Sequence, residues 1–302
     1  MNDTYYTTSK QLPSFKERHP FIFWVAVLLT VLSLFNILKS FAGKIKSGSS
    51  FENTFAVIRI DGMILEADKT LAWIETIRKD QNIKAVILRI DSPGGGVGAS
   101  EEIYTALARL NETKPVIASM GSIAASGGLF VAMGARKIVA NQTTLTGSIG
   151  VKMEIPNLEG AMNFLGIRSQ VLVTGELKDA GSMYRPMTEQ EKEYLMNIMK
   201  DMNNRFIEVI GTSRKLAKEK VVAIADGRAI TGNEAKKLGL IDELGDFNTA
   251  VDLAKKITGL EDSEIELKEE PEKEVGFLKT LLTSYLGIKI QSPHSVSYNF
   301  YY

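Results

Sequence analysis

Cysteine is absent from the 302 residues, and only two histidines are present, His19 and His294. Without cysteine the chain has no disulfide, no thiolate metal site and no cysteine nucleophile. The histidines lie toward the two ends of the chain. We therefore expect neither a histidine-rich zinc site nor, unless the tail folds back, a Ser-His-Asp triad in the central part. A nucleophilic serine would need another base.

Neither sign of charge dominates. The 36 lysines and arginines equal the 36 aspartates and glutamates in number. No global charge favours a nucleic acid or a strongly acidic partner, and we expect no nucleic-acid partner. With 44% hydrophobic and 24% charged residues, the composition is that of a globular protein of one large domain or two small ones.

Near the N-terminus, the twenty residues from His19 to Leu38 carry no formal charge when His19 is neutral. At about 1.5 Å per residue, such a helix is roughly 30 Å long, the thickness of a bilayer core. A cleaved signal peptide is the alternative, because Ser40-Phe41-Ala42 has a small-x-small pattern. The apolar run exceeds the roughly 7–15 residues of the apolar core of a signal peptide, and Lys39 precedes the site, so we predict an uncleaved anchor. Lysines and arginines flank both sides, so charge does not set the topology.

Beyond this segment, strand and helix patterns alternate. Apolar runs predict strands at 55–60, 85–90 and 116–120, with helices at about 69–79 and 100–110 between them. This βαβαβ order implies parallel strands with right-handed crossovers. Further strands are expected at 137–140 and 170–173, and further helices near 158–165 and at 252–257. A long helix is expected from Thr188 to Gly211, because Thr188 and Glu191 can form a capping box at its start.

These patterns divide the chain into segments. We predict an N-terminal tail at 1–18, a transmembrane anchor at 19–41, a linker at 42–52 and a catalytic domain at 53–260. Residues 261–302 are expected to form an acidic, solvated linker followed by an aromatic tail, which could occupy the active-site cleft, pack on a neighbouring subunit or be disordered.

Two glycine-rich turns follow two of the predicted strands. One is Asp91–Gly96, and the other is Gly121–Gly128, which contains Ser126. Gly94, Gly96 and Ala99 fit a dinucleotide fingerprint, but the next strand ends without the carboxylate that would hold a ribose, and no P-loop lysine follows. At the carboxyl ends of neighbouring parallel strands, the two turns would instead place backbone N–H groups around Ser126 as an oxyanion hole. The alternative is two packing turns without chemistry.

A base for Ser126 has to be a lysine or a carboxylate. Keeping a lysine neutral at pH 7 costs about 4–5 kcal/mol and requires burial. Lys178 follows the predicted strand at 170–173 and is one candidate, and spacing does not choose it over the others, Lys84, Lys114, Lys137 and Lys152.

A set of motifs in order resembles the signal peptide peptidase A family of bacterial membrane-anchored serine proteases. The motifs are Asp91–Gly95, Gly121–Gly128, Thr146–Val151, Gly175–Lys178, and Asp226–Arg228 with Leu240–Gly245. The match runs from about Phe55 to Ile257, and a single repeat with one anchor suits the family's short form. Leu129-Phe130 departs from the aromatic pair that is common there.

The resemblance implies an α/β, crotonase-like (Clp protease-like) fold with a parallel sheet of repeated ββα/βαβ units, preceded by one transmembrane helix. It implies that Ser126 is the nucleophile, that Lys178 is the general base and that Ser148 orients Lys178. The oxyanion hole would use the N–H groups of Gly94, Gly95 and Gly127. The family forms ring-shaped homo-oligomers on the outer face of the cytoplasmic membrane and degrades released signal peptides.

We therefore expect a membrane-anchored serine endopeptidase with a Ser/Lys dyad and apolar peptide substrates. Neither a metal nor another cofactor is expected. Two alternatives are an acyl-CoA enzyme on the same fold and an inactive membrane scaffold or protease regulator. CoA binding would favour the first, and failure of an acylating inhibitor to label Ser126 would favour the second.

Overall fold

The computed structural model describes residues 15–46 and 53–270. The predictions for residues 1–14, 47–52 and 271–302 lie outside the described residues. They include most of the predicted N-terminal tail and the aromatic tail. The chain divides into two compact units, Met1–Phe51 and Glu52–Tyr302. Each is described by itself.

The first unit contains α1 (Phe15–Arg18) and α2 (Pro20–Lys46). Many apolar side chains of α2 are exposed, among them Phe21, with 81% of its surface accessible, and Trp24, with 59%. Among the described residues, no helix has both the length and the apolar character needed to cross a membrane. The transmembrane anchor at 19–41 stays a prediction.

The centre of the second unit is a parallel sheet, as the sequence predicts. β1 (Thr54–Asp61), β2 (Ile83–Ser92) and β3 (Val116–Ala124) lie side by side. The full strand order is β6 (Ala229–Thr231), β5 (Leu145–Gly147), β3, β2, β1 and β8 (Glu266–Lys268). β4 (Lys137–Ala140) pairs with both β3 and β7 (Glu243–Leu244). β5 and β6 form the antiparallel pair. Because β2 and β3 are parallel neighbours, the turns that follow them meet at one edge of the sheet.

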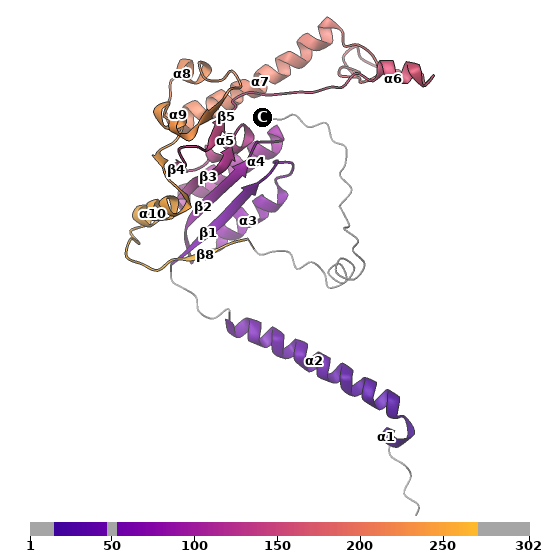
Figure 1. Cartoon of the computed structure of the whole chain (residues 1–302), viewed down its shortest axis with the longest axis vertical. Helices are drawn as coiled ribbons and strands as arrows, with labels where there is room; N and C mark the ends of the chain where they lie inside the picture. Colours follow the sequence, from indigo (N-terminus) through magenta and orange to yellow (C-terminus); the bar gives the residue numbers. More distant parts are fainter. Residues whose placement is uncertain (1–14, 47–52, 271–302) are drawn as a thin grey trace, which may run out of the picture. The chain divides into compact units, whose positions relative to one another are not determined.

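Helices cover both faces of this sheet (Figure 1). α3 (Asp68–Lys79) and α4 (Val97–Thr113) connect the first three strands, and α10 (Phe247–Thr258) covers the opposite face. The side chains of β1 alternate accordingly, since Ala56, Ile58 and Ile60 belong to one hydrophobic core and Phe55 and Val57 to the other. The predicted strands thus have two buried faces.

The second half of the unit builds the layer around the site. After β3 come α5 (Gly127–Ala132), β4 (Lys137–Ala140) and β5 (Leu145–Gly147). The remaining short elements are α8 (Lys218–Val222), β6 (Ala229–Thr231), α9 (Gly232–Lys237) and β7 (Glu243–Leu244). They return the chain to the sheet before α10.

Between these parts, residues 150–188 hold mostly exposed side chains. α6 (Glu159–Phe164) matches the predicted helix, and α7 (Glu189–Arg214) begins at the predicted Thr188–Glu191 capping box. It runs beyond Gly211, the predicted end, and stops where Lys215 adopts a left-handed conformation with φ of 54°. The predicted strand at 170–173 is absent, because these residues pair with no other strand of the described chain and Leu172 is 89% exposed.

The acidic segment after α10 is not entirely a solvated linker. Residues Glu266–Lys268 form β8, which pairs in parallel with β1 at the edge of the sheet. Two ion pairs hold this strand, from Arg59 to Glu269 at 2.7 Å and from Lys268 to Asp80 at 2.8 Å. In this acidic segment, Glu269 thus has a basic partner and Lys268 an acidic one on neighbouring elements.

Candidate active site

Ser126 lies at the turn from β3 into α5, in a conformation that is unusual for a residue with a side chain. Its φ is 54° and its ψ is −119°. Such a backbone costs about 1–3 kcal/mol and persists only when the surroundings fix it. The fixing contacts are hydrogen bonds from the Ser126 N–H to the Gly147 carbonyl oxygen, at 2.9 Å, and from the Phe130 N–H to the Ser126 carbonyl oxygen, at 2.9 Å. A strained serine held in this way is a candidate nucleophile.

The glycine turn after β2 lies directly against this serine. A Cβ on Gly94 would be 2.8 Å from the Gly127 nitrogen and 2.9 Å from the Ser126 Cβ, and Gly94 has a φ of +106°. A Cβ on Gly127 would be 3.2 Å from the Gly95 nitrogen. Glycine is therefore required at both positions for the two turns to approach this closely.

Backbone donors collect where these turns meet. The Gly94 N–H donates to the Ser92 Oγ at 3.1 Å. In the described part of the chain, the N–H groups of Gly95 and Gly127 donate to no acceptor. Unpaired donors in a buried turn are unusual, and two of them beside a serine hydroxyl suit an oxyanion.

The segment after β1 covers the glycine turn that follows β2. The Ile64 N–H donates to the Gly94 oxygen at 3.0 Å, and the Gly96 N–H donates to the Ile64 oxygen at 2.7 Å. A Cβ on Gly95 would lie 2.2 Å from the Ile64 oxygen, so this position also excludes a side chain. The contact fixes the peptide plane whose N–H at Gly95 stays free.

A third turn, after β5, brings Ser148 to the same place. The Thr146 Oγ1 donates to the Ala124 oxygen at 2.7 Å, and the Ser148 N–H donates to the Arg228 oxygen at 2.8 Å. Ser148, like Ser126, has a positive φ, of 52°. The two serines line one cavity of about 580 Å³, together with Met63, Pro93, Gly150, Val151, Lys152, Glu154 and Gly227.

Four of the five candidate lysines have partners. The Lys152 Nζ lies 2.6 Å from the Glu154 carboxylate, and this hydrogen bond raises the pKa of Lys152. Lys137 pairs with Asp242 at 2.9 Å. The remaining two donate to backbone oxygens, Lys84 to Gln81 and Lys114 to Ile77 and Asp80.

Lys178 is placed apart from the serines. It lies in a turn and is exposed, and it lines a separate hollow of about 500 Å³ with Glu176, Gln190 and Tyr194. Within residues 53–270, its ammonium group makes no hydrogen bond or ion pair. A single copy of the chain thus brings Ser126, Ser148, Gly95 and Gly127 together, and Lys178 does not line their cavity.

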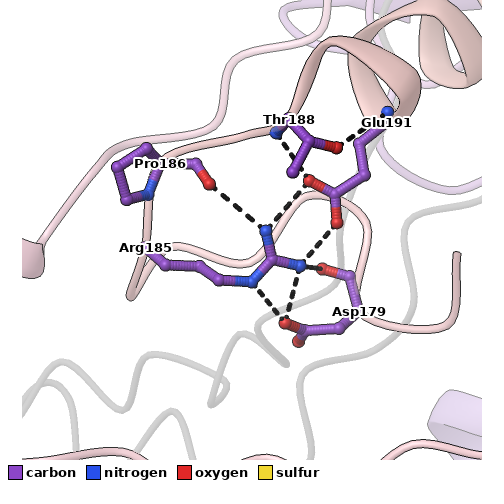
Figure 2. Close-up of polar contacts among 5 residues, drawn as sticks. All are labelled: Asp179, Arg185, Pro186, Thr188 and Glu191. Carbon is purple, nitrogen blue, oxygen red and sulfur yellow. Dashed lines mark hydrogen bonds and ion pairs between the residues drawn. The ribbon is translucent and has the colours of Figure 1, made fainter. Parts of the chain in front are cut away.

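The turn that carries Lys178 is fixed by residues that the sequence analysis missed (Figure 2). Arg185 donates to the Asp179 carboxylate at 2.9 Å and to both carboxylate oxygens of Glu191, at the start of α7. The capping box at Thr188 and Glu191 was the one sequence signal near the Arg185 contacts.

The sequence analysis also missed Ser100, beside the glycine turns. Its buried hydroxyl has no hydrogen-bond partner among the described atoms and packs against Gly127.

Comparisons with known proteins show which family the chain is similar to. Residues 108–261 match the model of peptidase family S49, and residues 43–146 match that of Clp protease. A putative protease of Synechocystis is 38% identical over 221 residues, which cover 72% of this chain and 79% of that protein. A putative signal peptide peptidase SppA of Enterococcus faecium is 34% identical, over 73% of this chain and 62% of that protein.

Protease 4 of Salmonella typhi is 36% identical over 72% of this chain, which spans only 36% of that longer protein. The α/β fold and the strained serine among free backbone donors, together with these matches, define a peptidase on a Clp protease-like fold. The chain belongs to peptidase family S49 and is a member of the signal peptide peptidase A family.

Proposed function

We propose that the chain is a serine endopeptidase with Ser126 as nucleophile and Lys178 as general base, and that residues 53–260 form its catalytic domain. The observation that carries the proposal is the strained Ser126 beside the unpaired N–H groups of Gly95 and Gly127. The nearby Gly94 N–H is bonded to Ser92, so Gly95 and Gly127 are the stronger oxyanion donors.

In this mechanism the Ser126 Oγ attacks the peptide carbonyl carbon while its proton passes to the neutral Lys178 Nζ. The N–H groups hold the oxyanion of the tetrahedral intermediate. The carbon–nitrogen bond then breaks, the leaving amine takes the proton from Lys178, and an acyl-enzyme remains. Lys178 next removes a proton from water, which attacks the ester carbonyl carbon. The bond from this carbon to the Ser126 Oγ then breaks, Lys178 returns the proton to the Oγ, and the second product leaves.

Elimination among the lysines supports this assignment. Lys152 lines the Ser126 cavity, but its ion pair with Glu154 favours the charged form, the opposite of what a base requires. Lys178 has no partner in the described part of the second unit that would hold its proton. Its present exposure would have to be lost, since a neutral lysine at pH 7 requires a desolvated site.

A second copy of the chain would supply that burial. Lys178 lines a hollow apart from the Ser126 cavity, and the segment before it exposes large apolar side chains, including Phe164 at 90% and Leu172 at 89%. Exposed apolar clusters of this kind suit a subunit interface. We therefore propose a ring-shaped homo-oligomer in which Lys178 of one copy reaches Ser126 of the next and Ser148 orients it there.

Substrate and location follow from the apolar lining and the N-terminal unit. Met63, Pro93 and Val151 line the cavity, so we propose apolar peptides, with released signal peptides as the natural substrates. Residues 19–41 would anchor the enzyme in a bacterial cytoplasmic membrane with the catalytic domain outside. The uncharged run and the exposed apolar side chains of α2 support the anchor.

The proposal is tested by assaying the full-length Ser126→Ala and Lys178→Ala variants on an unstructured apolar peptide. Each should lose at least about 1,000-fold in kcat, because a missing nucleophile or base removes the covalent route. Lys84→Ala is the matched control, because Lys84 does not line the Ser126 cavity, and it should retain most of its turnover. Turnover close to that of the unaltered protein in either dyad variant would reject the dyad.

A further inference from the structure

Arg185 joins the Lys178 turn to the long helix α7. Its guanidinium uses all five of its N–H donors, toward the carboxylate and carbonyl oxygens of Asp179, both carboxylate oxygens of Glu191, and the Pro186 oxygen (Figure 2). Asp179 is the residue after Lys178, and Arg185 holds it by main chain and side chain together. The turn that carries Lys178 is therefore connected to α7 through Asp179, the residue that follows Lys178.

The helix end of this connection is itself fixed. Only 5% of the Glu191 side chain is exposed, and its carboxylate also accepts the Thr188 N–H at 2.8 Å. The Arg185 guanidinium lowers the pKa of Glu191 to about 2. At its other end, α7 buries Phe206 and Ile210 in the core, so Glu191 is attached to the rigid part of the unit.

The two partners of Arg185 each adjoin, in the chain, a residue that lines the hollow of Lys178. Gln190, beside Glu191 in the first turn of α7, lines the same hollow as Lys178, and the other titratable groups there are Glu176 and Tyr194. Arg185 thus sets the position of the turn and also neutralises two carboxylates, one of which adjoins Lys178 in the chain. Unpaired, the Asp179 carboxylate would favour the charged form of a neighbouring lysine.

We propose that Arg185 is a positioning residue for the catalytic base, which fixes the Lys178 turn against α7 and screens Lys178 from the Asp179 carboxylate. This inference rests on the proposed role of Lys178. A fixed turn matters because a base misplaced by about 1 Å can lose 100-fold in rate. Arginine suits this position better than lysine because its planar fork binds two carboxylates at once.

Charge and geometry are separated by three variants, Arg185→Gln, Arg185→Lys and Asp179→Asn, assayed as full-length protein on an apolar peptide across a pH series. The acid limb of kcat/KM reports the pKa of the base in the free enzyme. Arg185→Gln should lower kcat at least tenfold and move this limb up by about 0.5 pH unit or more, since an unneutralised carboxylate stabilises the lysine cation. Asp179→Asn should move it down, because the arginine cation remains.

Arg185→Lys keeps the charge but loses the fork, so it should lower kcat while leaving the limb close to its original pH. Arg205→Gln is the matched control. Arg205 also lies on α7 and binds the carboxylates of Glu101 and Glu208, but it is 14 residues, about 21 Å of helix, beyond Glu191. It should leave both the rate and the limb unchanged, and thermal unfolding of every variant reports any loss of folding.

Each result decides something. Retained turnover in Lys178→Ala overturns the proposed function and this inference together. Loss of turnover there, combined with equal acid limbs in Arg185→Gln and Arg205→Gln, overturns this inference alone, because a merely structural contact does not shift the kinetic pKa. If Arg185→Gln fails to fold, the other two variants still test the inference. Asp179→Asn has to move the acid limb to lower pH, and Arg185→Lys has to leave it in place while lowering kcat.

Discussion

The N–H of Ser126 donates a hydrogen bond of 2.9 Å to the carbonyl oxygen of Gly147. Gly147 is the residue before Ser148, so this one bond ties the candidate nucleophile to the turn that carries the second cavity serine. The Thr146 hydroxyl adds a bond to Ala124, two residues before Ser126. The unfavourable backbone of Ser126 is thus held from a neighbouring segment at its N–H and from its own helix, through the Phe130 N–H, at its carbonyl oxygen.

The close approach of the glycine turns predicts a sensitive position at Gly94. Gly94→Ala would place a Cβ within 2.9 Å of both the Gly127 nitrogen and the Ser126 Cβ, at a φ of +106°. We expect a loss of about 100-fold or more in kcat, since a displaced oxyanion donor costs that much. Steady-state kinetics with the apolar peptide measure it.

Gly98→Ala is the control for that change. Gly98 lies in α4 with nothing within 4 Å of an added Cβ, so alanine should leave kcat unchanged and add about 0.5–1 kcal/mol to the free energy of unfolding. Full activity in Gly94→Ala would contradict an oxyanion hole built from these turns.

The separation of Lys178 from the Ser126 cavity predicts complementation between copies. Ser126→Ala and Lys178→Ala proteins, each inactive, should regain activity when they are unfolded together and reassembled. Random mixing in a closed ring would restore about a quarter of the sites. Activity is measured against each variant reassembled alone, and no recovery despite mixed oligomers on native mass spectrometry would place both residues in one copy.

Met63 predicts part of the substrate preference. It lines the cavity with Ser126, whereas Leu65, two residues later and similarly exposed, does not. Met63→Lys should lower kcat/KM for an apolar peptide by about tenfold or more, because it replaces one of the apolar side chains of the cavity with a charged one. Leu65→Lys should change it little, and equal losses in the two variants would remove Met63 from the substrate site.

Glu191 predicts an acid dependence of stability. Its pKa in the folded chain is about 2, below the ordinary value of a glutamate, so its contribution to the free energy of unfolding is complete above about pH 4.5 and is lost as the pH falls toward 2. The difference between the unaltered protein and Glu191→Gln should therefore shrink from pH 5 to pH 3 in urea unfolding.

Glu208→Gln provides the comparison, because Glu208 is exposed and accepts one hydrogen bond, from Arg205 at 3.1 Å. Its effect on stability should be small at both pH values. A pH-independent difference for Glu191→Gln would mean that the ion pair with Arg185 adds nothing to folding.

The sequence was sufficient for the sheet and for the serine turns. Nearly continuous apolar runs at 55–60 and 85–90 specify strands with two buried faces, and glycines after parallel strands specify turns that meet at one edge. The strand expected at 170–173 is wrong for a physical reason. Apolar residues there require cover, but the pattern does not say whether a strand or another molecule provides it.

The Arg185 cluster was out of reach for a different reason. Which charges meet is decided by the geometry of a turn between Asp179 and Glu191, and no periodicity encodes it. The role of Lys178 came from resemblance, because spacing left five lysines open and the contacts of each became visible only in the structure.

The three residues of β8 also decide how the chain can be shortened. They occupy the backbone groups along the start of β1, which would otherwise offer a free edge to any other extended chain. A protein that ends before Glu266 should therefore associate through β1, whereas one that ends after Glu274 keeps this edge paired. We therefore expect the acidic segment to protect the start of β1 from association with other extended chains.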